Sequence, residues 1–188
     1  MSTFRRNAAN FISVLLSFVR LTLTKIFYPK NIFYKLIERL SPNVVVDLDR
    51  RSKIILGKRV SAHSGCRISA NSGGVLKIGN NTSFNVGCIL TCRYKIEIGS
   101  GVAIGPNTMM FDHNHTMGKN GTKKSSFINA EITIGDNTWI GAGTIILAGT
   151  HIGANCVIAA GSVVKGEVPD GTVLIQKRES TYKDVEFY

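Results

Sequence analysis

The chain has 188 residues, of which 44% are hydrophobic, and a formal net charge of +11. This length fits one domain with a small appendage, and the apolar content excludes general disorder. Residues 1–59 hold 12 Lys and Arg against 3 Asp and Glu, a net of +9, whereas residues 60–188 hold 11 against 9, a net of +2. The asymmetry favours a polyanionic neighbour such as anionic lipid or an acidic glycan, or else is a solvated basic face. We expect no nucleic-acid partner, because no module for base recognition is present.

The first predicted element is a helix over the apolar stretch FISVLLSFVRLTLTKIFY at residues 11–28. Its uncharged run, residues 11–19, is shorter than the ~20 residues that span a bilayer. No small-residue cleavage site follows, so a signal peptide is excluded. The spacing of the apolar residues predicts one apolar face, which lies on a membrane surface, on the domain or on a partner subunit. We assign residues 1–53 to this basic, amphipathic, helical region.

Four cysteines, at positions 66, 88, 92 and 156, form no CxxC pair of the kind that binds metal. We expect them to be buried, reduced thiols. That state favours a cytoplasmic protein, with peripheral contact at the inner face of the membrane.

From Ile134 onwards the chain repeats every six residues, as IGDNTW, IGAGTI, ILAGTH, IGANCV and IAAGSV. The first position is always Ile, the fourth is Asn or Gly, and the fifth is small. The same frame appears earlier, in IGNNTS, FNVGCI, IGSGVA and IGPNTM, so that nine hexads keep the Asn or Gly position. Asn and Gly enter the left-handed backbone region most readily, so the chain is expected to turn once per hexad. Short strands between such turns stack into a β-solenoid with a continuous aliphatic core.

The repeat is interrupted by FDHNHTMGKNG at residues 111–121. The frame resumes at Ile134, which predicts a projecting loop at residues 116–131. His113 and His115 alternate along an extended chain and are expected to point the same way. An imidazole can take a proton from a hydroxyl near neutral pH. Alternatives are surface histidines that cap the loop, or a zinc site whose third ligand would be His63 or His151, although neither belongs to a recognisable ligand set.

On these motifs the sequence resembles the hexapeptide-repeat acyltransferases over roughly residues 54–178. It is similar to the galactoside, maltose and xenobiotic O-acetyltransferases and to acetyltransferases of polysaccharide clusters. The resemblance implies an all-β fold, a left-handed parallel β-helix of triangular section with about five coils, after an N-terminal α-helical segment. It also implies acetyl-CoA as co-substrate, no metal, and a homotrimer with active sites between subunits. Residues 179–188 are a C-terminal tail.

The resemblance also assigns catalytic and acceptor-binding residues. The segment IGPNTMMFDHNH places His115 at the family's general base, with His113 as the second candidate base or a contact to the acceptor. Asp112 is expected to orient one of the two imidazoles. FNVGC places Asn85 where these enzymes bind the acceptor.

The cofactor-binding residues follow from two further motifs. IGDNTWIGAGT resembles the family's I-G-x-x-x-W-I-G stretch, which implies that Trp139 and Gly141 line the thiol arm and that the amide of Ala142 is an oxyanion donor. AAGSVVK places Ala160 and Lys165 at the pantetheine and phosphates. The family's usual ending is absent, and Lys177 and Arg178 are candidates for phosphate contacts instead.

The predicted function is transfer of an acetyl group from acetyl-CoA to a saccharide hydroxyl by direct attack, with His115 as base. A nonenzymatic scaffold, an N-acyltransferase acting on an amino sugar and a zinc hydratase are the alternatives.

Overall fold

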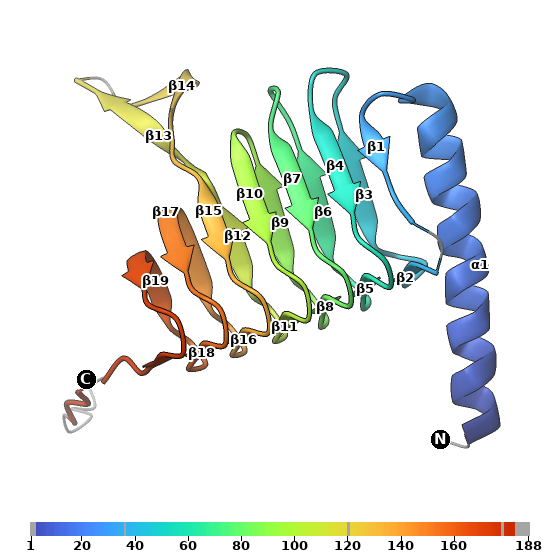
Figure 1. The fold of residues 1–188 in the computed structure, drawn as a ribbon. Helices are drawn as coiled ribbons and strands as arrows, with labels where there is room; N and C mark the ends of the chain where they lie inside the picture. The colour runs from blue at the N-terminus through green and yellow to red at the C-terminus, as the bar shows by residue number, and fades with distance from the viewer. Residues whose placement is uncertain (1–2, 36, 120, 178, 183–188) are drawn as a thin grey trace, which may run out of the picture.

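The computed structural model describes residues 3–35, 37–119, 121–177 and 179–182. One helix, α1 (Thr3–Phe27), crosses the end of a parallel β-solenoid, and the C-terminus lies at the opposite end (Figure 1). Successive strands are joined so that three columns of parallel strands enclose the core. The solenoid has about six turns, one more than expected.

Each column is a ladder of strands from successive coils. The first column contains β1 (Ile32–Phe33), β4 (Lys53–Leu56), β7 (Val75–Ile78), β10 (Lys95–Ile98) and β15 (Ile132–Ile134). The second contains β3 (Val45–Leu48), β6 (Arg67–Ala70), β9 (Ile89–Cys92) and β12 (Met109–Phe111). β17 (Ile145–Ile152) and β19 (Val163–Val168) bend round the corner and continue both columns. The third contains β2 (Arg39–Leu40), β5 (Ser61–Ala62), β8 (Ser83–Phe84), β11 (Ala103–Ile104), β16 (Trp139–Ile140), β18 (Val157–Ile158) and β20 (Val173–Leu174).

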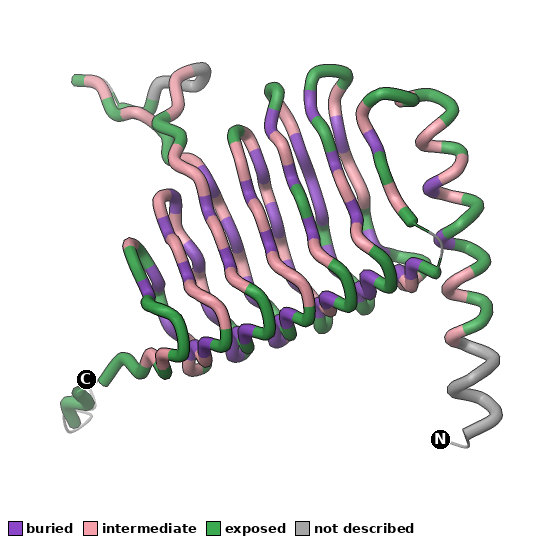
Figure 2. The backbone as a smooth tube through the Cα atoms, in the orientation of Figure 1, coloured by how far each residue is buried: buried purple, intermediate pink, exposed green. Residues whose placement is uncertain are grey.

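The hexad positions occupy the places that the repeat predicts. The first-position isoleucines, Ile134, Ile140, Ile146, Ile152 and Ile158, are 0–3% exposed and form part of the core. Buried and exposed residues alternate along each coil (Figure 2). All nine Asn or Gly turn residues have positive φ, between 55° and 80°. The six-residue rhythm therefore does set one left-handed turn per strand.

The predicted fold class, a left-handed parallel β-helix with an N-terminal helix, is confirmed, but its start is not at residue 54. The first coil begins at β1, because Ile32 and Phe33 pair with β4. Corners of the first two coils use residues outside the Asn/Gly rule, such as Ile37 with φ 78° and Arg59 with φ 61°. The repeat signal is therefore weak next to α1, and the solenoid begins one coil earlier than the repeat indicates. Within residues 1–53, only the first part is helical.

The predicted loop at residues 116–131 is an antiparallel hairpin instead. β13 (His113–Gly118) pairs with β14 (Gly121–Asn129), with a bulge between His115 and Met117. Both histidines therefore lie on the hairpin, not on the coil. The hairpin projects where the second column passes to the first (Figure 1).

The predicted helix with one apolar face is confirmed as α1, and it packs on the first coil through Ser17 and Leu21, both fully buried. By length and composition alone, Asn10–Phe27 is long and apolar enough to cross a membrane, with a mean hydropathy of 1.4. This differs from the expectation that the run is too short, because Arg20 and Lys25 do not interrupt the helix. The four cysteines are free and buried, as expected.

Candidate active site

Asp112 anchors the hairpin to the coil beneath it. Its side chain is fully buried. The carboxylate accepts hydrogen bonds from the backbone N–H of Arg93, at 2.9 and 3.1 Å, and from that of Tyr94, at 2.8 Å. These two residues form the turn between β9 and β10. The carboxylate therefore caps a turn of the preceding coil at the point where its own coil is interrupted.

The same carboxylate holds one imidazole. Asp112 Oδ1 lies 3.0 Å from His113 Nδ1, and the His113 side chain is 12% exposed. A carboxylate on Nδ1 favours the tautomer with the proton on that atom, which leaves Nε2 as the nitrogen that can accept a proton. The sequence left open which imidazole Asp112 orients, and the contact is with His113.

His115 lies on the same face of the hairpin but is exposed. It stands opposite Phe127 in the strand register, with ring centroids 4.6 Å apart. The His113 ring meets the same Phe127 edge-on at 5.5 Å. Arg93 also belongs to the cluster, because its guanidinium carbon lies 3.7 Å from the centroid of the Phe127 ring. Phe127 and Arg93 were not predicted as site residues, since the hairpin pairing brings Phe127 to the histidines and coil stacking brings Arg93 to Phe127.

Cys92 ends strand β9 beneath this cluster and is fully buried. Burial raises the pKa of its thiol strongly, and the negative charge of Asp112 raises it further. A thiol in this environment stays protonated, and therefore it is no nucleophile at neutral pH.

A second group of predicted residues lies on the outer side of the third column. Asn85 and Trp139 line a cavity of about 160 Å³ together with His63, Ser83 and Gly105. Trp139 is 58% exposed, and Asn85 Oδ1 accepts a hydrogen bond from the N–H of Val86. His63 was considered only as a metal ligand. It lies one coil before Asn85, because its N–H donates to Phe84 O, but it falls outside the recognisable hexads.

Gly141, Ala142 and Ala160 lie in neighbouring turns that follow third-column strands, at the same corner as Asn85. A Cβ on Gly141 would approach the backbone nitrogen of Ala160 to 2.4 Å, so only glycine allows the two coils to stack here. Ala142 and Ala160 are exposed. This corner thus presents a row of small residues with accessible backbone beside Trp139.

The two predicted lysines lie apart from both groups. Lys165 is exposed on β19 in the last coil. Lys177 is exposed after β20, where the neighbouring Gln176 side chain bonds the backbone of Val163. Arg178 lies outside the described residues.

The single chain therefore forms two separate clusters. Asp112, His113 and His115 stand at the corner between the second and first columns, whereas Asn85 and Trp139 face outward from the third column. The second-column sheet lies between these positions. No contact within one chain joins an imidazole of the hairpin to Trp139 among the residues described.

The remaining histidines offer no metal centre in the described part of the chain. His151 Nδ1 is 2.9 Å from the Thr133 hydroxyl, and His63 belongs to the cavity beside Asn85. Among the residues that the structure describes, no three His, Cys, Asp or Glu side chains gather as a metal-binding group would require.

Six-residue turns, three strand columns and a histidine hairpin between coils define the chain as a hexapeptide-repeat β-solenoid. Residues 131–166 match the family model described as bacterial transferase hexapeptide (six repeats). The chain is 29% identical over 125 residues to a galactoside O-acetyltransferase of Lactococcus lactis, which covers 63% of this chain and 60% of that protein. The predicted resemblance to the hexapeptide-repeat acyltransferases is thus confirmed.

Solved structures show the same likeness. A maltose O-acetyltransferase from Clostridium difficile is 29% identical, with a TM-score of 0.50, over 77% of this chain and 61% of that one. AntD, an N-acyltransferase from Bacillus cereus, has a TM-score of 0.62 over 88% of this chain and 90% of its own, but its 18% identity shows the fold alone. The chain spans about 60% of the length of the Lactococcus and Clostridium proteins.

Proposed function

We propose that this chain is an acyltransferase that moves an acetyl group from acetyl-CoA to a saccharide hydroxyl. The observation that carries the proposal is the carboxylate-held imidazole of His113, placed on a hairpin at the edge of a hexapeptide solenoid. The O-acetyltransferases of galactosides and maltose among its relatives support the reaction and the acceptor class. The AntD structure contains coenzyme A, which supports the co-substrate.

We assign the general base to His113, with His115 beside the acceptor. The sequence resemblance favoured the reverse assignment. The contact with Asp112 supports the change, because a carboxylate on Nδ1 orients the ring and stabilises the imidazolium that forms during proton transfer. His115 is exposed, and among the described side chains its ring contacts that of Phe127, which leaves it accessible to a ligand.

The proposed step transfers the acetyl group directly. His113 Nε2 takes the proton of the acceptor hydroxyl as its oxygen attacks the thioester carbonyl carbon. The C–O bond forms, the C–S bond then breaks, and the imidazolium returns its proton to the departing sulfur. Base catalysis of this kind contributes roughly 10²–10⁴-fold to the rate. The amide of Ala142 is the proposed donor to the carbonyl oxygen as negative charge develops there.

The proposed site is shared between copies of the chain. His113 and Trp139 belong to one site only if Trp139 comes from a neighbouring copy, because the second column separates them within one chain. We therefore propose a homotrimer in which the hairpin of one subunit faces the Asn85, Trp139, Ala142 and Ala160 corner of the next. Lys165 and Lys177 are the proposed phosphate contacts at the last coils.

The test measures turnover of acetyl-CoA by the full chain with mixed saccharides, monitored as release of the coenzyme A thiol. We expect His113→Gln to lower kcat by roughly 10²–10⁴-fold, while His115→Gln mainly raises KM for the acceptor. His151→Gln is the matched control and should leave turnover unchanged, because His151 hydrogen-bonds Thr133 in the first column, away from both proposed groups of site residues.

Three results would contradict parts of the proposal. Equal kcat in the wild type and His113→Gln, with a large loss in His115→Gln, would return the base to His115. Turnover with amino sugars but with no hydroxyl acceptor would show N-acylation instead. Absence of any thermal shift on adding coenzyme A would favour a nonenzymatic solenoid.

A further inference from the structure

Helix α1 turns toward the solenoid a side that combines the buried Leu21 with polar side chains. Ser17 is fully buried, and its hydroxyl accepts a hydrogen bond from the N–H of Leu40 at 2.8 Å. Arg20 Nη1 donates to the carbonyl of Val44, and Lys25 Nζ donates to that of Ile32 at 2.8 Å. The two cations between Asn10 and Phe27 are therefore both held by backbone carbonyls of the first coil.

The opposite side of α1 is apolar and open. The exposed fractions of its large apolar side chains range from 43% to 74%, in Phe11, Ile12, Leu15, Leu16, Phe18, Val19, Leu23, Ile26 and Phe27. Soluble monomers seldom expose so long a continuous apolar surface. Helix–solenoid packing does not cover it, because that packing uses the opposite side, with Ser17, Leu21 and Lys25.

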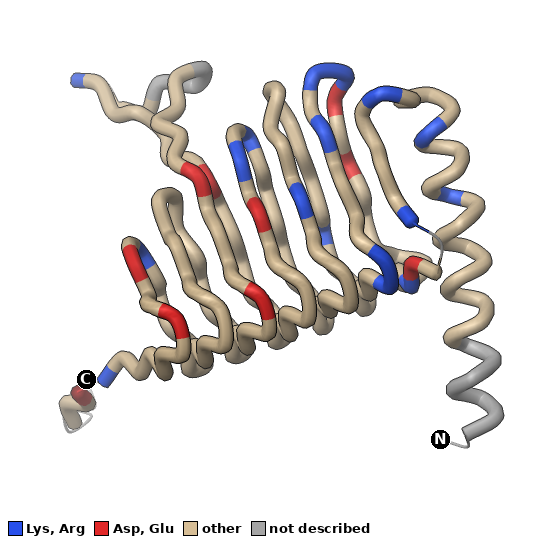
Figure 3. Tube along the Cα trace, viewed as in Figure 1, with Lys and Arg blue, Asp and Glu red and all other residues tan. Residues whose placement is uncertain are grey.

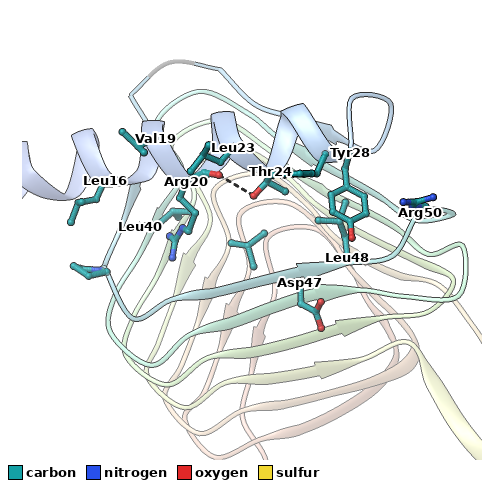
Figure 4. Close-up of a pocket in the computed structure, with 13 residues that line it drawn as sticks. Leu16, Val19, Arg20, Leu23, Thr24, Tyr28, Leu40, Asp47, Leu48 and Arg50 are labelled. Carbon is teal, nitrogen blue, oxygen red and sulfur yellow. Dashed lines mark hydrogen bonds between the residues drawn. The ribbon is translucent and has the colours of Figure 1, made fainter.

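This apolar surface continues into a groove of about 650 Å³ between α1 and the first coil. Figure 4 shows Leu16, Val19 and Leu23 on the helix side. Leu40, Val46 and Leu48 line the strand side, and Arg50 stands at one end. Most of the groove lining is therefore apolar, and its charged residues are Arg20, Asp47 and Arg50.

The same end of the molecule is basic. Lysines and arginines gather around α1 and the first coils, whereas most acidic residues lie further along the solenoid (Figure 3). The three acids in residues 28–59 are engaged by the protein: Glu38 is buried, Asp49 accepts from the Ser52 hydroxyl, and Asp47 lies 3.5 Å from Arg67. The exposed cations of that stretch are Lys30, Lys35, Arg50, Arg51, Lys53, Lys58 and Arg59.

We propose that α1 lies in the plane of an anionic lipid bilayer, with its outer face at the boundary between headgroups and acyl chains. The exposed apolar side chains of α1 would enter the lipid, and the cations around them would meet lipid phosphates. The helix would therefore seat the end of the solenoid on the membrane. This inference does not rest on acyl transfer, because the proposed active site uses later coils.

Two other arrangements fit the structure less well. A spanning α1 would draw the first coil into hydrocarbon, because Ser17, Arg20 and Lys25 bind that coil along the helix. A second copy placed face to face on α1 would bring the same exposed cations together, and like charges oppose such a contact.

The first experiment measures flotation of the full chain with vesicles of phosphatidylcholine, with or without phosphatidylglycerol. We expect binding to the anionic vesicles, weakening as salt is raised, and much less binding to neutral ones. The triple variant I12Q/L15Q/I26Q should bind at least roughly a hundredfold more weakly, because each large apolar side chain leaves the lipid. The control I12L/L15I/I26L keeps the face apolar and should bind as the wild type does.

A second pair of variants tests the charge. R50Q/R51Q should weaken binding to anionic vesicles about thirtyfold, since each of the two cations near the surface contributes on the order of 1 kcal/mol. K119Q/K165Q removes the same charge further along the solenoid and should change binding less than about twofold. Circular dichroism confirms that each variant keeps its fold.

Three results would overturn the proposal. One is a folded wild type that does not bind anionic vesicles. Another is a triple glutamine variant that binds anionic vesicles as the wild type does. If the wild type does not bind lipid but forms an oligomer that is lost in the triple glutamine variant, α1 lies between copies instead. The third is an N-terminal fragment protected from protease inside sealed vesicles, which would show a spanning helix.

Discussion

At the scale of single residues, Glu38 is a carboxyl group that is buried where its charged form is disfavoured. It is 3% exposed, and its Oε2 accepts a hydrogen bond from the N–H of Val60 at 2.7 Å. Burial raises its pKa to about 7, although the backbone hydrogen bonds oppose the shift. Oε1 has no partner among the described atoms, so the neutral form suits this position better than the charged one.

We expect Glu38 to make the folded chain less stable as pH rises from about 4.5 to about 7. In this window the unfolded chain releases the proton that the folded chain still holds, so raising the pH favours unfolding. Glu38→Gln should remove that dependence and stabilise the fold above pH 7, by at most about 3 kcal/mol. Urea unfolding at several pH values measures this, and identical pH profiles for the two proteins would contradict it.

Asp112 shows how far a single residue could be predicted. Its position beside two histidines in the sequence DHNH indicated that it orients an imidazole. Its other role, capping the turn at Arg93 and Tyr94, depends on how the coils stack. Residues eighteen and nineteen positions apart meet there only because one coil lies on the next.

At the scale of elements, the hexad turn is a local property that the sequence specifies directly. Asn155 has a φ of 55° and is exposed, so its place in the repeat reflects backbone conformation and not packing. We expect Asn155→Ala to lower the free energy of unfolding by about 1–2 kcal/mol, because alanine resists the left-handed region. Asn155→Gly should change it by only a few tenths of a kcal/mol. Urea unfolding compares the two, and an equal effect would show that the side chain itself stabilises the turn.

The hairpin is the element that the sequence described least well. The loss of the six-residue frame marked an insertion, but the pairing of β13 with β14 joins residues across a polar, irregular segment. Phe127 reaches both histidines only through this pairing. A pattern of periodic turns contains no information about a segment that leaves the period.

At the scale of the whole molecule, the proposed site requires two copies of the chain. Neither His113→Gln nor Trp139→Ala should be active alone, because each variant damages every site of its own trimer. Trimers assembled from an equal mixture of the two should keep about a quarter of their sites intact, each with an unchanged His113 from one subunit and an unchanged Trp139 from the next. Thiol release by refolded mixtures measures this recovery, and mixtures as inactive as the separate variants would argue against a shared site.

The sequence by itself determined the solenoid, its turn residues, its aliphatic core and an apolar face on α1. These follow from local backbone preference and from which side chains avoid water, and both repeat every coil. Only the tertiary structure decided that Asp112 holds His113 and that α1 packs on the first coil through Ser17 and Leu21. It also separated the hairpin from Trp139. Such relations depend on how coils stack and corners are placed, because residues distant in sequence become neighbours only when the chain has closed into its three columns.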